Sequence, residues 1–143
     1  MFAEFDEKDY PCVKVKLNQK PRSDDDFNHF IQKWRDLYKQ KRDYYFLFDT
    51  LQVTNPPLKY CIQMSQFIKE LRKENYQYLQ ESIILINNNK VKWLLDFIFT
   101  IQPPVAPVYI YHIQNGETLD IESIKKHKNT SIITPSKPLL PIF

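Results

Sequence analysis

Apolar residues recur along the chain with two different periods, which predict both strands and helices. Residues 12–18 alternate apolar and basic side chains with the two-residue period of a half-buried strand, and residues 1–5 can form a short edge strand before it. Residues 24–38 carry apolar side chains at helical spacing, directly after Ser23 and within an acidic start that suits a helix N-terminus. We therefore expect a pair of strands followed by an amphipathic helix.

Three further apolar runs have the composition of central strands. Residues 44–49 form a continuous aromatic and apolar run, which predicts a strand that is covered on both faces and ends at Asp49. Residues 81–87 and 107–113 repeat the pattern. Each neighbouring pair of runs is separated by a helical pattern, so we expect all three strands to lie in one sheet.

Proline and asparagine residues predict where the two connecting helices begin. Pro56 and Pro57 suit the first turn of a helix, because an amide hydrogen is not needed there. Three consecutive asparagines at positions 87–89 form a polar turn that can cap a third helix over residues 90–101. A weaker amphipathic pattern at residues 119–127 predicts one more short helix.

The order of these elements predicts an α/β domain with a mostly parallel central sheet of about five strands and helices packed on it. We expect this domain to span residues 1–128. Residues 129–143 carry prolines at every third place, which favours an extended tail. Its apolar side chains should pack either on the same domain or on another subunit; they include Leu139, Leu140 and Phe143.

Composition narrows the class of protein. A chain of 143 residues is the size of one domain, and its 43% hydrophobic content excludes a wholly disordered chain. A net charge of +3 is too small to indicate nucleic acid as a partner. Cys12 and Cys61 lie outside zinc-binding spacings and are too few for a disulfide framework, which favours a reducing compartment.

Targeting and membrane signals do not stand out in the sequence. The first ten residues alternate acids with aromatics and resemble neither a secretory signal nor a transit peptide. The apolar stretch 93–101 is interrupted by Asp96 and followed by two prolines, so it is too short for a transmembrane helix. We expect the protein in the cytoplasm or within a large assembly.

Two stretches carry a resemblance to known families. Residues 44–54, YYFLFDTLQVT, resemble the strand and turn of STAS domains, which are related to bacterial anti-sigma factor antagonists; Asp49, Val53 and Thr54 agree with that pattern. Residues 78–112 resemble the strand, helix and strand of the distantly related, lipid-binding Sec14 (CRAL-TRIO) type. With the element order, the resemblance covers about residues 1–128 and implies a STAS-like sheet.

Departures from both families limit what the resemblance implies about function. Antagonist proteins place a phosphorylatable serine at the start of the helix after the turn, whereas this chain has Pro56, Pro57 and Leu58 there. The resemblance therefore implies partner binding without a phosphoserine switch. Sec14-type carriers have a longer chain with an N-terminal helical extension, so a full lipid-transfer cycle is not expected from 143 residues.

Polar residues near two predicted strand ends form one candidate ligand or partner site. Open α/β sheets commonly bind ligands at the carboxyl ends of their strands. The same residues also suit a purely structural role, with Thr54 and Asn55 capping a helix and the asparagines forming a turn, and we favour this interpretation. The candidate residues are Asp49, Thr50, Thr54, Asn55, Asn87, Asn88 and Lys90.

Catalytic patterns are lacking. Gly116 is the only glycine, which excludes glycine-rich phosphate-binding loops. The three histidines occur singly, and Ser65 and Ser82 have no glycines around them to form a nucleophile elbow. The three aspartates at positions 24–26 suit a helix cap better than a metal site. We expect no enzymatic activity, no cofactor and no bound metal.

The helix predicted at residues 90–101 has more apolar surface than one sheet can cover. Its apolar side chains surround nearly the whole helix, whereas packing on a sheet needs one stripe. We expect Trp93 and Phe97, together with the aromatic helix at residues 24–38, to form an interface with another protein or a second copy. The predicted function is a non-enzymatic interaction or structural module; the alternative is binding of a lipid or small ligand.

Overall fold

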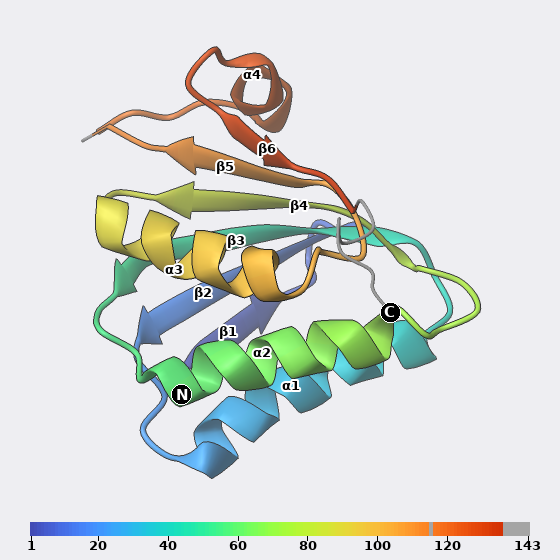
Figure 1. Cartoon of the computed structure of the whole chain (residues 1–143). Coiled ribbons are helices and arrows are strands. Elements are labelled where there is room, and N and C mark those ends of the chain that lie inside the picture. Colours follow the sequence, from blue (N-terminus) through green and yellow to red (C-terminus); the bar gives the residue numbers. More distant parts are fainter. Residues whose placement is uncertain (115, 136–143) are drawn as a thin grey trace, which may run out of the picture.

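A computed structural model describes residues 1–114 and 116–135, and within them the strands form one mixed six-stranded sheet (Figure 1). The sheet order β1-β2-β3-β4-β5-β6 follows the chain order. The strands are β1 (Ala3–Asp6), β2 (Cys12–Gln19), β3 (Tyr44–Val53), β4 (Leu79–Ile86), β5 (Val108–His112) and β6 (Ser131–Ile133). The helices are α1 (Asp24–Lys39), α2 (Leu58–Leu71), α3 (Asn89–Ile101) and α4 (Ile121–Lys126).

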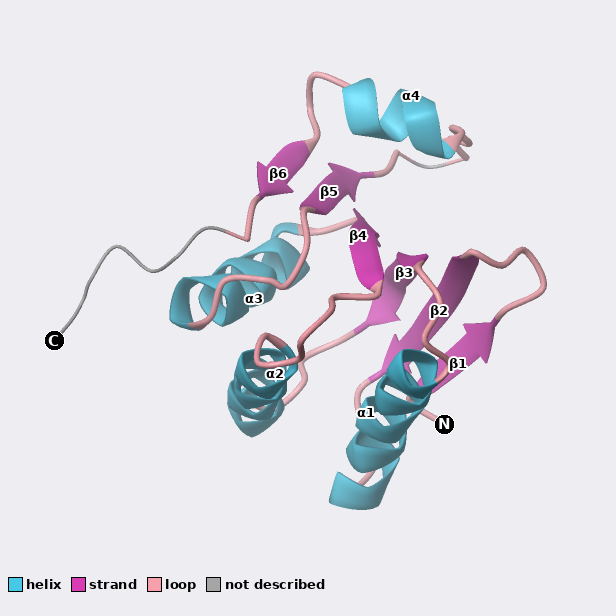
Figure 2. Ribbon diagram, turned by 90° about the vertical axis from the view of Figure 1, so that its right-hand side faces the viewer, coloured by secondary structure: helices cyan, strands magenta, loops and turns pink. Residues whose placement is uncertain are grey.

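The sheet has a parallel centre and antiparallel edges. β2, β3, β4 and β5 run parallel, while β1 and β6 pair antiparallel with β2 and β5. The helices α1, α2 and α3 connect β2 to β3, β3 to β4 and β4 to β5, and each connection moves one strand further toward the same edge of the sheet. The three helices therefore lie on one face of the sheet (Figure 2). The expected α/β class, with its mostly parallel sheet, is confirmed.

Local sequence signals place the helix starts where they are observed. The Ser23 hydroxyl accepts a hydrogen bond from the amide of Asp26 at 3.2 Å and caps α1, whereas the aspartates at positions 24–26, which we also expected to suit a cap, lie in the first turn of the helix. The Asn88 side chain accepts from the amide of Val91 at 3.0 Å and caps α3. α2 instead begins after Pro57, without a side-chain cap. The expectation that Thr54 and Asn55 cap this helix is therefore wrong.

The main core lies between the sheet and α1–α3. Alternate residues of the strands point toward the helices and are buried there, among them Val13, Phe46 and Ile84. Aromatic rings from α1 and β3 pack edge to face, with ring centroids of Trp34 and Phe46 at 4.9 Å. This is the apolar layer in which the candidate site below is found.

The opposite face of the sheet is covered less completely. α4 packs there on β4 and β5 through Ile124, which contacts Ile83 and Tyr111, and Lys125 forms an ion pair with Glu81 at 3.0 Å. α4 does not extend over β3, whose Tyr45 and other residues on this face are only half buried. The expectation that residues 44–49 are covered on both faces is therefore wrong, because the three long helices share one face.

Two element boundaries differ from the sequence prediction. β3 continues four residues beyond Asp49, because its pairing with β2 resumes after a bulge and joins Asn18 to Gln52 and Gln19 to Val53. Residues 131–133, placed in the tail by the sequence analysis, form β6 at the sheet edge. Within the described residues, every helix is too short or too polar to cross a lipid bilayer.

Candidate ligand-binding cavity

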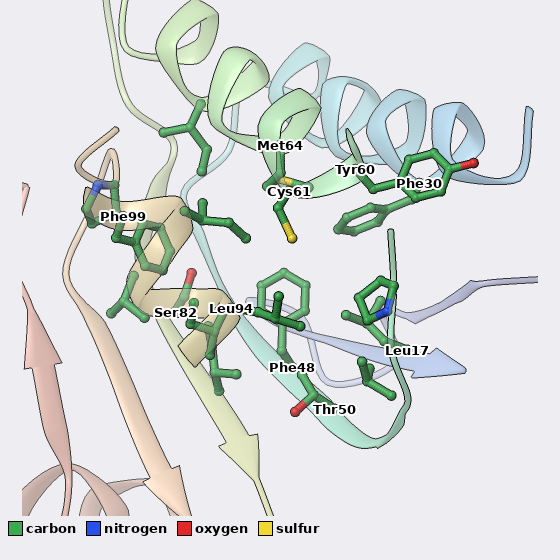
Figure 3. A pocket seen from close by; sticks show the side chains of 18 of the residues that line it. Leu17, Phe30, Phe48, Thr50, Tyr60, Cys61, Met64, Ser82, Leu94 and Phe99 are labelled. Atoms are coloured by element: carbon green, nitrogen blue, oxygen red, sulfur yellow. The ribbon is translucent and has the colours of Figure 1, made fainter. Parts of the chain in front are cut away.

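An apolar cavity of about 160 Å³ lies between the sheet and the three long helices (Figure 3). Its floor is formed by β2, β3 and β4, and its roof by α1, α2 and α3. The chain after α3 closes one end with Pro104, Val105 and Ala106. Residues labelled in the view of the cavity are Leu17, Phe30, Phe48, Thr50, Tyr60, Cys61, Met64, Ser82, Leu94 and Phe99.

The exposure of the lining residues varies along the cavity. Around the start of β5, Pro104, Ala106 and Val108 are buried, whereas Val105 is half buried. At the carboxyl ends of β2 and β3, Leu17 and Val53 are only half buried, as is Pro56 before α2. Open α/β sheets commonly bind ligands at this edge.

The chemistry of the wall is almost entirely apolar. Among the described residues, no lining side chain carries a charge. Burial raises the pKa of the Cys61 thiol, so this lining group is neutral at pH 7. The hydroxyl of Thr50 donates to the carbonyl oxygen of Leu85 at 2.6 Å, and that of Tyr60 donates to Asp24 at 2.9 Å outside the cavity. The site can thus hold an apolar molecule by shape and dispersion contacts.

Two helices are held together above the cavity by aromatic and polar contacts. The rings of Phe27 in α1 and Tyr60 in α2 stack with centroids 4.9 Å apart. Lys59 approaches Asp24 at 3.1 Å, and this ion pair joins the same two helices at the exposed surface. The Tyr60 hydrogen bond, followed by the Lys59 contacts, holds the pKa of Asp24 below its usual value.

The polar residues proposed from the sequence lie near the carboxyl ends of β3 and β4. Most of them form hydrogen bonds within the chain. Asp49 accepts from the amide of Leu51 at 2.9 Å and faces the other side of the sheet. Asn87 donates to the carbonyl oxygen of Leu51 at 3.4 Å, so the two turns do lie at the same edge. Asn88 is the helix cap described above. These contacts agree with a structural role.

The remaining members of this polar set are divided between the surface and the core. Thr54, Asn55 and Lys90 are exposed, and the backbone amide of Thr54 donates to the carbonyl oxygen of Gln19 at 2.9 Å. Thr50 is buried and belongs to the cavity wall. The structure thus places one of the seven proposed residues in the apolar cavity and the other six outside it.

The proposed interface residues of α3 lie at the surface. Trp93 is 56% exposed and stacks on the half-buried Phe97, with ring centroids 5.7 Å apart. By contrast, the α1 aromatics are buried in the core, so their expected place in an interface is wrong. Leu139, Leu140 and Phe143 lie outside the described residues.

Sequence patterns did not indicate the cavity. Its lining comes from segments spread over residues 2–108, and only their packing brings them together. The one retrospective signal is a set of small side chains at buried positions, Cys61, Ser82 and Ala106, where larger residues would fill the space. Such residues are common in cores, so they identify a cavity only once the neighbours are known.

Comparisons with known proteins add no relative to this description. No family model, no curated protein and no solved structure matches the chain. Within the described residues, no group of histidine, cysteine, aspartate or glutamate side chains is arranged to hold a metal ion.

Proposed function

We propose that this chain binds a small apolar ligand in the cavity beneath α1–α3, without enzymatic chemistry. The observation that carries the proposal is the cavity itself, with about 160 Å³ of space and an uncharged, apolar wall. An engineered apolar cavity of about 150 Å³ in another protein stays dry and binds benzene or xenon. The space here is therefore suited to one small organic molecule.

Energetics favour an occupant. Side chains that line an empty space have no partner atoms on that side and lose dispersion contacts. An apolar ligand would supply those contacts.

The size of the cavity limits the ligand class. Of the two families that the sequence resembles, the Sec14 type binds lipids, and an apolar cavity supports that branch of the resemblance. A volume of about 160 Å³ holds one ring or one short chain rather than the two long chains of a phospholipid. We therefore propose a single-chain or single-ring apolar ligand.

Thermal unfolding in the presence of toluene tests this proposal. Saturation at about 100 times Kd should stabilise the folded chain by about 2.7 kcal/mol and raise Tm by several degrees. Cys61→Leu adds carbon atoms where the thiol points into the cavity (Figure 3) and should reduce the shift at least tenfold. Cys61→Ala, which leaves the space open, should retain it. A wild-type Tm that toluene does not raise would contradict the proposal.

A second function is favoured by a different observation, the exposed apolar ridge on α3. We define the α3 ridge as Trp93, Phe97 and Ile101; Trp93 and Ile101 are more than half exposed. Leu58 and Ile62 of α2 are also exposed, and α2 packs directly against α3. We propose that the α3 ridge is a self-association surface, because clustered exposed apolar side chains are typical of interfaces.

Sedimentation equilibrium tests this second proposal. The double variant Trp93→Ala with Phe97→Ala should shift an oligomer to monomer while the chain stays folded, with Tm lowered by the loss of the half-buried Phe97 ring. Ile132→Ala is a matched control, because this side chain is 55% exposed but lies on β6, outside the α3 ridge. A wild-type chain that stays monomeric at concentrations near 100 μM, or a control that dissociates equally, would contradict self-association through the ridge.

A further inference from the structure

Aromatic side chains border the cavity on several sides. The ring of Phe48 on β3 forms part of the floor. Phe30 of α1 and Tyr60 of α2 lie at one side of the space, and Phe99 of α3 lies at the other (Figure 3). Met64 of α2 lines the roof between them. Each of the three long helices therefore contributes an aromatic ring to the wall, as does the central strand β3.

These rings pack on their neighbours with the geometry that aromatic pairs prefer. Phe48 meets Phe30 edge to face, with ring centroids 6.4 Å apart, and lies 4.6 Å from Phe46. Tyr60 stacks on Phe27 with centroids 4.9 Å apart. Such pairs are favourable because the negative face of one ring attracts the positive edge of another. On their other side the lining rings border empty space, so a ligand ring placed there would extend the aromatic cluster.

A saturated ligand would gain less from this wall than an aromatic one. Any apolar molecule makes dispersion contacts in the cavity, but only an aromatic ring adds the attraction between ring face and ring edge at Phe48 and Phe99. The thioether of Met64 favours the same ligand class, because its polarisable sulfur interacts well with aromatic edges. A flexible alkyl chain would also lose rotational freedom in a compact space, whereas a rigid ring has none to lose.

We propose that the ligand is an aromatic ring compound, and that Phe48 and Met64 select it over saturated hydrocarbons of similar size. This inference rests on the proposed ligand-binding function and narrows its ligand class from a ring or chain to an aromatic ring. Because no lining side chain among the described residues carries a charge, the ring has no charged substituent inside the cavity.

Binding of toluene, methylcyclohexane and n-heptane, which have the same number of carbon atoms, tests the inference. Headspace gas chromatography measures the association constant of each hydrocarbon. Dividing each constant by the partition coefficient from water into hexadecane removes the difference in hydrophobicity between the probes. The corrected constant of toluene should exceed the other two about fivefold. Phe48→Leu should remove most of this preference, because it replaces the ring by an alkyl side chain.

Leu94→Ala is the matched control for the size of the cavity. It removes as many carbon atoms from the wall as Phe48→Leu does, but no ring, and it should retain the preference for toluene. Met64→Leu conserves volume at a half-buried position and removes the sulfur, so it should reduce the preference about twofold. An unchanged preference in Met64→Leu would overturn the role of this residue, and if Phe48→Leu does not fold, it would overturn the inference.

The outcomes separate this inference from the proposed function. If methylcyclohexane or n-heptane binds as well as toluene after correction, the aromatic assignment is overturned while ligand binding stands. The same holds if Phe48→Leu and Leu94→Ala change the preference equally, because cavity size and not ring contact then selects the ligand. If none of the three hydrocarbons binds the wild-type chain, the proposed function itself fails.

Discussion

Helices α1 and α3 lie in the same layer and each carries one of the two tryptophans of the chain, yet they use their apolar side chains differently. Trp34 of α1 is 6% exposed and packs between β3 and α2, whereas Trp93 of α3 is 56% exposed. Both helices contribute to the roof of the cavity. Of these two helices, only α3 leaves large apolar side chains exposed.

The difference follows from the distribution of apolar residues around each helix. In α1 they form one stripe, and charged or amide side chains occupy the other face, so the sheet and α2 use the stripe completely. In α3 the stripe formed by Val91, Leu94 and Ile98 is buried, and the α3 ridge lies outside it. The distribution of apolar residues around a helix, and not its number of aromatic residues, thus decides whether its apolar side chains are all buried or partly exposed.

The largest expected effect comes from replacing each tryptophan with alanine. Trp34→Ala should reduce the free energy of unfolding by about 3–5 kcal/mol, because it removes contacts with Phe46 and Phe67 and enlarges the cavity. Trp93→Ala should change it by about 0.5 kcal/mol or less. Chemical denaturation followed by far-UV circular dichroism measures both. Similar losses for the two variants would place Trp93 in the core.

A smaller effect is expected at the start of α3, where Asn88 is the cap. Asn88→Ala should reduce the free energy of unfolding by about 1 kcal/mol, because the amide of Val91 loses its acceptor. Asn87→Ala is the neighbouring control, since its 3.4 Å hydrogen bond to Leu51 is long and the residue is exposed; about 0.5 kcal/mol or less is expected. Equal losses would show that the turn, and not the cap, stabilises this end.

The smallest effect depends on pH and distinguishes the start of α1 from that of α3, which has no acidic residue in its first turn. Burial raises the pKa of Asp26, but hydrogen bonds from the amides of Phe2 at 2.9 Å and Arg22 at 3.0 Å outweigh this, so the pKa lies below its usual value. Such a carboxyl stabilises the folded chain fully above its unfolded pKa, near 3.9, and this stabilisation is lost as pH falls through the folded pKa.

Asp26→Asn should therefore flatten the loss of stability between about pH 5 and pH 2, because the group that takes up the proton is gone. Denaturant midpoints measured across this range report the slope. Asp25→Asn removes a carboxylate from the same turn without removing either hydrogen bond, and it should retain most of the slope. If stability depends on pH equally steeply in Asp26→Asn and in the wild type, other carboxyl groups cause the loss of stability in acid.

Local patterns predicted part of the structure well and for identifiable reasons. The capping roles of Ser23 and Asn88 depend on hydrogen bonds to amides three residues away, so short segments are enough to indicate them. The sequence predicted that β3 ends at Asp49, whereas the strand continues to Val53. Its end is decided by the pairing with β2 beyond the bulge, which the residues after Asp49 do not indicate. The polar turns were placed at one edge correctly, but Thr50 proved to be part of the cavity wall.

The sequence by itself determined the α/β class, the order of the elements from β1 to α4, and the absence of glycine-rich phosphate loops, because these depend on periodicity, caps and composition. Only the tertiary structure decided that three helices share one face, that Trp34 is buried while Trp93 is exposed, and that an apolar cavity remains between sheet and helices. The physical reason is that empty space, like the exposure of a side chain, depends on where residues distant along the chain pack.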